Sequence, residues 1–241
     1  MLHSIFPVSA ANFCASIHNM DKPVNFIAWG RTGADSGRSW LRHLVATSPL
    51  ILAPLAIIIN FITLSSFEGS YASFAAAAVR EGFWTLCVKY GPELTFKGVF
   101  AVTAFIAWQA WLFAYLPGEI RTGQFTPAGH RLQYCLNGLS AWALTHVAYF
   151  TLCLTGVLDP AFIPRNWSSL IAALNLAGLV ISVVVFIKAH VCPTHADDRK
   201  FSGFAFYDFY MGIELNPRLG GNFDLKLFSN GRPGMILWTL M

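Results

Sequence analysis

The sequence predicts an all-α, polytopic membrane protein with four full spans, the start of a fifth, one interfacial helix and a long cytoplasmic loop. Three observations support this fold class. Of the 241 residues, 55% are hydrophobic and 12% are charged, whereas soluble domains carry roughly 25% charged residues. Several uncharged stretches reach the roughly 20 residues that cross a bilayer core. The polar residues gather between these stretches, as expected for loops that connect membrane spans.

The first 43 residues predict a largely irregular, cytoplasmic tail. They show no sustained hydrophobic period, and they contain Pro7, Pro23 and a Gly-, Ser- and Arg-rich run at 30–38. The basic start and continuous apolar segment of a secretory signal peptide are not found there. We therefore expect insertion to rely on the first membrane span.

Four apolar stretches predict the complete spans of a membrane domain that runs from residue 44 to 241. Pro49 and Pro54 in the first stretch predict a kink, because proline removes a helical hydrogen bond. Tyr115 lies near the end of the second, as an interfacial anchor would. The final apolar run has about half the length of a span, so we expect a truncated chain or a fragment. The spans are expected at 44–64, 98–117, 138–158 and 168–187, and the next begins at 233.

The stretch 71–88 predicts the interfacial helix. Its composition is rich in alanine, and Arg80 and Glu81 interrupt the apolar residues, which favours an amphipathic helix at the membrane surface. A plain connecting loop is the alternative.

The charge and cysteine content limit the possible binding partners and predict the orientation of the chain in the membrane. The tail and the loops 117–137 and 188–232 hold twelve of the sixteen Lys and Arg residues, which predicts that they are cytoplasmic. The formal net charge of +4 without a basic block excludes a typical nucleic-acid partner. The five cysteines are odd in number and lack zinc-site spacing, so we expect unpaired thiols and no metal site.

The loop 203–234 concentrates the groups that could carry chemistry. A helix over 207–215 would end before Pro217, because the residue preceding proline avoids the helical conformation. Alternatively, the charged side chains of this loop pair with one another and hold the loop against the helix ends. The candidate catalytic groups are Tyr207, Asp208 and Glu214, and the candidate phosphate-binding groups are Arg218, Lys226 and Arg232.

Polar and aromatic residues within the spans give further candidates. His146 could donate a proton, since polar residues in membrane spans are often functional; a neutral histidine bonded between helices is the alternative. Trp142, Asn175 and Trp238 could line a ligand cavity, although Asn175 could equally join two helices.

Two groups of motifs resemble the sterol C-14/C-7/C-24(28) reductase family. Upstream segments are most similar to the 7-dehydrocholesterol (Δ7-sterol) reductase branch, and they include Leu116-Pro117-Gly118, Thr126-Pro127-Ala128-Gly129 and Thr145-His146. The family signature is matched by Gly203, Tyr207-Asp208, Gly212 and Asn216-Pro217-Arg218.

The resemblance implies reduction of the C7=C8 ring double bond of a sterol by NADPH. It implies a sterol substrate, a lipid bilayer and other sterol-biosynthesis enzymes as partners, and the endoplasmic reticulum membrane in a eukaryotic cell. The family also has a second group of spans and an Arg-rich C-terminal motif, which this chain lacks, so most cofactor-binding residues are expected beyond residue 241. The alternative function is a non-catalytic scaffold or sterol-binding protein that resembles the lamin B receptor.

Overall fold

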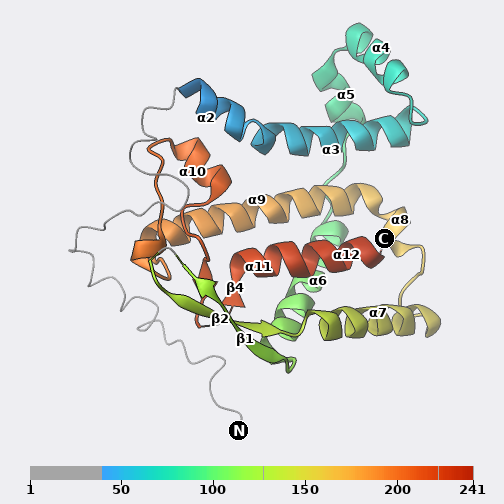
Figure 1. The fold of residues 1–241 in the computed structure, drawn as a ribbon. Coiled ribbons are helices and arrows are strands. Elements are labelled where there is room, and N and C mark those ends of the chain that lie inside the picture. Colours follow the sequence, from blue (N-terminus) through green and yellow to red (C-terminus); the bar gives the residue numbers. More distant parts are fainter. Residues whose placement is uncertain (1–39, 127, 222, 241) are drawn as a thin grey trace.

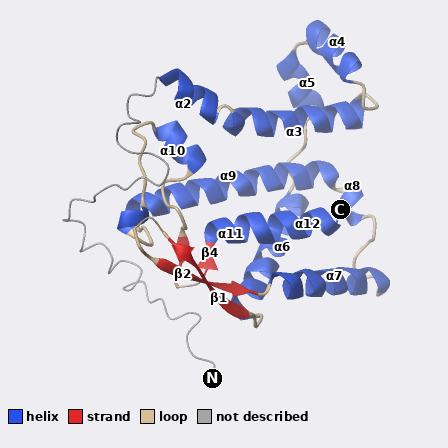
Figure 2. Cartoon of the chain, viewed as in Figure 1, coloured by secondary structure: helices blue, strands red, loops and turns tan. Residues whose placement is uncertain are grey.

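The structure is a computed structural model that describes residues 40–126, 128–221 and 223–240. The side chains of Trp40, Arg42, His43 and Trp238 lie outside this description, as do residues 1–39 of the irregular tail predicted for residues 1–43. The described chain is mostly helical. Several helices run side by side, and two short β-hairpins lie at one end of them (Figures 1 and 2).

Three helical segments are long and apolar enough to cross a membrane. They span residues Leu44–Ser66, Phe96–Tyr115 and Trp167–Val191, which correspond to the predicted first, second and fourth spans. The third predicted span forms only a 17-residue helix, α7 (Gly138–Leu154). It ends early because the following residues turn, with Gly156 at a φ of 73°. By this criterion of length, three of the four predicted full spans are confirmed and the third stays a prediction.

The first span is broken near its prolines, as expected. Helix α2 (Trp40–Thr47) stops one residue before α3 (Pro49–Ser66) begins with a proline. Proline is well tolerated at the start of a helix because its missing N–H would have no intrahelical partner. Pro54 lies inside α3 without ending it. Helix α2 starts at Trp40, which lies within the predicted tail.

The predicted interfacial helix is two helices, α4 (Tyr71–Glu81) and α5 (Phe83–Tyr90). Gly82 separates them with a φ of 92°, a conformation that glycine adopts without a steric penalty. A small core joins this pair to α3 and contains Ile62, Phe74, Ala77 and Leu86.

The all-α prediction was wrong for the loop 117–137, which contains a β-hairpin. Strands β1 (Glu119–Phe125) and β2 (Arg131–Leu136) pair antiparallel. Gly123 faces the Tyr134 ring so closely that a Cβ at this glycine would lie 2.7 Å from it. The hairpin is hard to predict from the sequence, because most of β1 is exposed and lacks the alternating pattern of a half-buried strand.

Helix α9 (Trp167–Val191) follows the short helix α8 (Phe162–Arg165). Helix α6 (Phe96–Tyr115) crosses α9 closely at Gly98, where a Cβ would lie 2.6 Å from the Ser169 carbonyl oxygen. A second core joins α6 and α7 to the last helix, α12 (Met235–Leu240), through Leu112, Ala141 and Ile236.

The loop 188–232 is not a plain loop. Its α10 (Ala205–Met211) stops at Gly212, with a φ of 78°, so the helix predicted over 207–215 was too long. Strands β3 (Arg218–Leu219) and β4 (Phe223–Asp224) form a second hairpin. The short elements η3 (Ala196–Asp198), α11 (Leu225–Ser229) and the π-helical η4 (Asn230–Gly234) complete it.

The two long predicted loops meet at one end of the helices. Figure 1 shows both hairpins and α10 at that end, and α4, α5 and α8 at the other. We call residues 117–137 and 192–232, together with the adjoining end of α9, the polar cap. The common location agrees with the alternation of loops that the predicted spans require.

Candidate functional site

The polar cap holds the buried charges of the described chain. Seven Asp, Glu, Lys or Arg side chains are buried among the described residues, and all belong to the cap. Burying a charge is costly unless it is paired and hydrogen-bonded, so each of these side chains needs a partner nearby. They are Lys188, Asp198, Asp208, Glu214, Arg218, Asp224 and Arg232.

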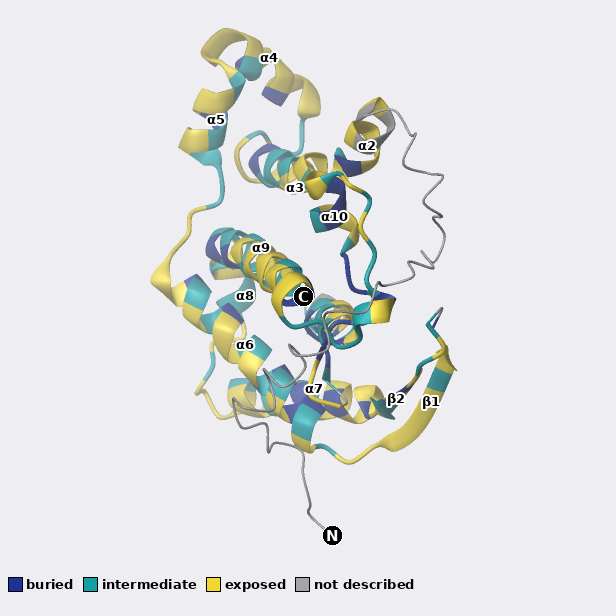
Figure 3. Cartoon of the chain, turned by 90° about the vertical axis from the view of Figure 1, so that its left-hand side faces the viewer, coloured by how far each residue is buried: buried dark blue, intermediate teal, exposed yellow. Residues whose placement is uncertain are grey.

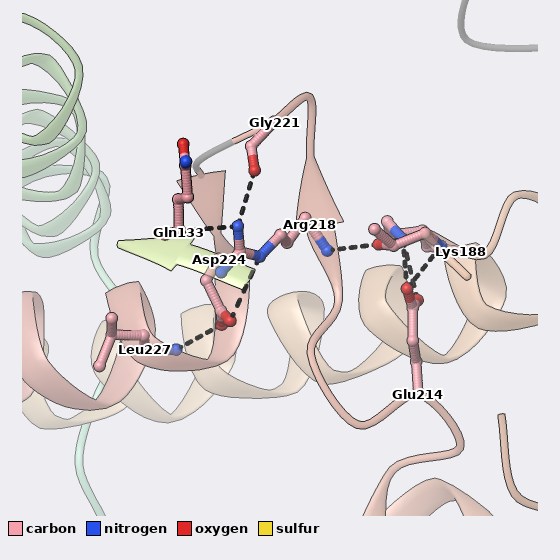
Figure 4. Close-up of polar contacts among 8 residues, drawn as sticks. Gln133, Lys188, Glu214, Arg218, Gly221, Asp224 and Leu227 are labelled. Atoms are coloured by element: carbon pink, nitrogen blue, oxygen red, sulfur yellow. Dashed lines mark hydrogen bonds and ion pairs between the residues drawn. The ribbon is translucent and has the colours of Figure 1, made fainter. Parts of the chain in front are cut away.

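Glu214 forms a buried ion pair with Lys188 from the last turn of α9. The ammonium nitrogen lies 2.8 Å from Oε2 and 3.1 Å from Oε1, and both side chains are almost fully buried. The Thr194 backbone N–H donates to Oε1 at 2.6 Å, and the Lys188 ammonium also donates to the Thr194 hydroxyl at 3.1 Å. This arrangement, visible in Figure 4, satisfies the carboxylate with protein donors.

Arg218 joins the two hairpins of the cap. Its Nη1 donates to the carbonyl oxygens of Gln133 in β2 and of Gly221, at 2.8 and 2.7 Å (Figure 4). The guanidinium also lies over the Tyr134 ring, 4.6 Å from its centroid, a favourable cation–π geometry. Its Nε is 3.8 Å from Asp224 Oδ2.

Two further contacts connect Arg218 to its surroundings. Its backbone N–H donates to the Thr194 hydroxyl at 2.9 Å, the same hydroxyl that Lys188 contacts. Asp224 accepts a hydrogen bond from the Leu227 N–H at 2.9 Å and so caps α11. One continuous network therefore runs from α9 through Glu214 and Arg218 to α11.

The three candidate phosphate-binding residues do not form a nucleotide-binding cradle. Arg218 has two nitrogens, Nε and Nη2, without hydrogen-bond partners among the described residues, but its side chain is only 4% exposed. Arg232 is also buried, and its guanidinium contacts the Asn137 backbone and side-chain oxygens. Burial lowers the pKa of Arg232. Only Lys226 is exposed, and a lysine meets a phosphate as a point charge rather than through a bidentate fork.

Two of the candidate catalytic residues lie in α10, which packs against α2 and α9. Tyr207 and Asp208 are both buried. Asp208 Oδ1 accepts a hydrogen bond from the Ser202 N–H at 2.8 Å. That contact holds the turn before the helix, so Asp208 has a structural partner.

His146 is on α7, where it contacts α12 rather than the cap network. Its Nδ1 is 2.8 Å from the Trp142 carbonyl oxygen and its Nε2 is 3.2 Å from that of Thr239. Trp142 donates its indole N–H to the Thr239 hydroxyl at 2.9 Å. These contacts join two helices, as in the structural alternative for His146.

Trp142 and Asn175, two of the three cavity candidates, form their hydrogen bonds with different helices. Trp142 is 40% exposed beside α12. Asn175 donates to the Ile171 carbonyl of its own helix, α9, at 2.9 Å. The side chain of Trp238 lies outside the described part of the chain.

Two polar clusters lie outside the candidate site residues. In the cap, His130 Nδ1 is 2.9 Å from Asp198 Oδ2, and its ring stacks on His195 with a centroid distance of 3.9 Å. Between α6 and α7, Gln109 and Trp108 both donate to the Thr145 hydroxyl, at 2.9 and 3.1 Å. No motif signals the cap cluster, because His130 is 68 residues from Asp198. Across the described residues, no group of three or more His, Cys, Asp or Glu side chains could hold a metal ion.

Comparison with known proteins places this architecture in a family. The profile of the "Ergosterol biosynthesis ERG4/ERG24 family" matches residues 46–241. The chain belongs to this family. It is 41% identical over 226 residues to a 7-dehydrocholesterol reductase of Danio rerio, covering 86% of this chain and 47% of that relative.

Two further relatives show the range of reactions named in the ERG4/ERG24 family. A 7-dehydrocholesterol reductase of Xenopus laevis is 40% identical over 162 residues, 62% of this chain and 34% of the relative. A Delta(14)-sterol reductase of Dictyostelium discoideum is 35% identical over 144 residues, 58% of this chain and 30% of the relative. The chain thus spans half or less of the length of these relatives.

The stretch that resembles the family signature forms the centre of the cap. Four of its residues are buried, namely Ile213, Glu214, Pro217 and Arg218. The two charged ones, Glu214 and Arg218, hold neighbouring segments. The signature of this ERG4/ERG24 member therefore encodes the packing of the cap, whatever further role its residues have.

Proposed function

We propose that the protein carrying this chain is a sterol reductase that saturates the C7=C8 ring double bond with NADPH. In the reaction, NADPH gives a hydride to one carbon, a proton is added to the other, and NADP⁺ is released. The observation that carries the proposal is the 41% identity to a 7-dehydrocholesterol reductase over 86% of this chain. Identity to a Delta(14)-sterol reductase is lower and covers less of the chain. The Thr126–Gly129 motif also favours the Δ7 branch.

Within this proposal, the described chain supplies the membrane environment and the cap. Three apolar helical segments suit a substrate that is itself a lipid. Arg218 and Arg232 are buried in contacts with the protein, so we assign them no part in nucleotide binding. Asp208 and Glu214 likewise hold neighbouring segments, and we assign neither a proton transfer.

The test is a sterol analysis of membranes that contain the complete protein. The full reading frame is expressed in cells without sterol Δ7 reduction, and membranes receive 7-dehydrocholesterol with or without NADPH. We expect cholesterol only with NADPH, and little conversion of a Δ14-sterol supplied in parallel. Well-expressed protein that leaves 7-dehydrocholesterol unchanged would refute the proposal, and preferential Δ14 reduction would move the protein to another branch.

A non-catalytic, sterol-binding scaffold is the second candidate. It is favoured by the engagement of the cap charges with one another, since Lys188 with Glu214 and Arg218 with Gln133 are protein-to-protein contacts. A photoreactive sterol would label such a protein in membranes without any NADPH-dependent product. Labelling together with product formation would instead favour the reductase.

We also propose that the cap faces the cytoplasm, at the endoplasmic reticulum membrane in a eukaryotic cell. The cap carries eight of the twelve Lys and Arg residues at positions 44–241, and the opposite end carries four, the bias expected of cytoplasmic loops. Engineered glycosylation sites test this orientation. A site between α5 and α6 should be glycosylated, whereas a site in the β1–β2 turn should not.

A further inference from the structure

Helices α4 and α5 form a helical hairpin, residues 67–91, that projects from the end of α3. Its inner side chains Phe74, Ala77 and Leu86 are buried against Ile62 of α3. Edge-to-face contacts of Phe67 with other rings close this small core. The hairpin is therefore a folded unit with a fixed inner and outer surface.

The outer surface of the helical hairpin carries large apolar side chains. Val79 is 88% exposed, Trp84 is 72% exposed and Val88 is 89% exposed. Trp84 and Val88 are four residues apart on α5 and so lie on one face of it. Figure 3 shows that much of the surface of both helices is exposed. Large exposed apolar side chains on both helices are typical of a surface that contacts protein or membrane in the working protein.

Basic residues lie next to this apolar surface. Arg80 adjoins Val79, and Lys89 adjoins Val88. Lys89 is 3.6 Å from Glu81, but both side chains remain largely exposed, so the pair is weak in water. Tryptophan and basic residues around an apolar face are typical of the boundary between lipid headgroups and acyl chains.

The position of the helical hairpin along the chain matches that boundary. It begins within a few residues of Ser66, where a helical segment capable of crossing a membrane ends. Tyr71 donates its hydroxyl to Asn60 of α3, which fixes α4 beside the end of that segment. The apolar outer surface thus continues from a lipid-facing helix.

We propose that the helical hairpin is an interfacial anchor whose partner is phospholipid. Val79, Trp84 and Val88 lie among the upper acyl chains, and Arg80 and Lys89 contact lipid phosphates. The proposal is independent of the reaction that the protein catalyses. It refines the single interfacial helix expected from the sequence into a two-helix unit with Trp84 at its centre.

Fluorescence quenching in vesicles tests the anchor. The complete protein is reconstituted in phosphatidylcholine with or without bromine on the upper acyl chains. Subtracting the emission of Trp84→Phe isolates the Trp84 signal, and Trp108→Phe provides the matched control for an indole held between helices. We expect brominated lipid to remove at least half of the Trp84 emission, and a smaller share of the Trp108 emission.

Two outcomes would overturn the proposal. Quenching of Trp84 by aqueous acrylamide but not by brominated lipid would show that the face lies in water. Protection from both quenchers would show that another segment of protein covers it. The double variant Arg80→Gln with Lys89→Gln tests the phosphate contacts, and we expect it to reduce the quenching of Trp84 by brominated lipid. Unchanged quenching would remove the basic residues from the anchor.

Discussion

The two ends of the helices contain the same kinds of charged residues but use them differently. In the polar cap, the side chains of Lys188 and Glu214 are 6% and 1% exposed. At the opposite end, those of Arg165 and Asp159 are 70% and 44% exposed. Solvated pairs typically contribute about 0–1 kcal/mol, whereas breaking a buried pair typically costs about 3–5 kcal/mol. An ion pair between the same types of group can therefore be structural at one end and dispensable at the other.

This difference clarifies what the signature of the ERG4/ERG24 family does here. Glu214 and Arg218 hold α9, both hairpins and the start of α11 in one network. The signature residues are thus needed for the architecture of the cap before any question of chemistry arises. Variants at the two ends should separate the buried network from the solvated pairs.

The largest effect is expected for Glu214→Gln. This change leaves the Lys188 ammonium buried without its charged partner, and we expect a loss of about 3–5 kcal/mol. Thermal unfolding of the complete protein in detergent measures the loss. Asp159→Asn, which removes the acid of an exposed pair, is the matched control. Equal melting temperatures for the two variants would abolish the distinction between the ends.

Arg218→Lys should be the next most harmful change. Lysine keeps the positive charge but not the planar fork that contacts two carbonyl oxygens and lies over Tyr134. We expect a loss of about 2–3 kcal/mol, the typical range for hydrogen bonds that involve charged groups. Faster proteolysis within the β1–β2 hairpin should accompany the loss. A lysine variant with wild-type stability would show that charge alone suffices.

Acidification should weaken the cap moderately through His195. Burial and the neighbouring His130 lower the pKa of His195 below its ordinary value of 6.5, against the opposing influence of Asp198 and Glu214. At pH values between the lowered pKa and 6.5, the unfolded chain binds more protons at this histidine than the folded chain does. The free energy of unfolding therefore falls as the pH drops below about 6.5, and it continues to fall until the lowered pKa is passed.

The control for this pH effect is His195→Gln. The variant cannot take up the proton, so its melting temperature should fall less than that of the wild type between pH 7.5 and pH 5.5. Identical slopes would show that His195 does not contribute to the acid sensitivity of the cap.

The smallest effect is expected at the opposite end, for Glu81→Gln. Its partner Lys89 is exposed and 3.6 Å away, so the change should cost less than about 1 kcal/mol. Comparing the thermal unfolding of this variant and the wild type, by calorimetry or by light scattering, sets an upper limit on the loss of stability. A loss comparable to that of Glu214→Gln would contradict the comparison of the two ends.

Much of the fold could be predicted from the sequence, because hydropathy reports the environment of each helix directly. Three of the four expected spans form segments of sufficient length, and the break near Pro49 follows from proline chemistry. The β1–β2 hairpin was missed because its exposed strand carries no hydrophobic pattern. Two helices end earlier than predicted, at Gly82 and Gly212, because each of these glycines adopts a positive φ. Composition alone does not reveal this conformation.

The candidate site was predicted less well, because its contacts join distant segments. The alternative that the loop charges pair among themselves is confirmed for Asp224 with Arg218, whereas Glu214 pairs with Lys188 of α9, outside the loop 203–234. Lys188 is 26 residues from Glu214 and directly follows the span predicted at 168–187. His130 and Asp198, 68 residues apart, gave no signal at all.

A double-mutant cycle between Lys188 and Glu214 tests the structural role of the cap most directly. Lys188→Met and Glu214→Gln are measured singly and together in the complete protein, by thermal unfolding and by sterol reduction. We expect the double variant to lose much less stability than the sum of the single losses, because neither charge is then left buried alone. Additive losses of stability would contradict the account. It would also be contradicted if the Glu214→Gln protein folds but has lost the proposed sterol reduction, and adding Lys188→Met does not restore it.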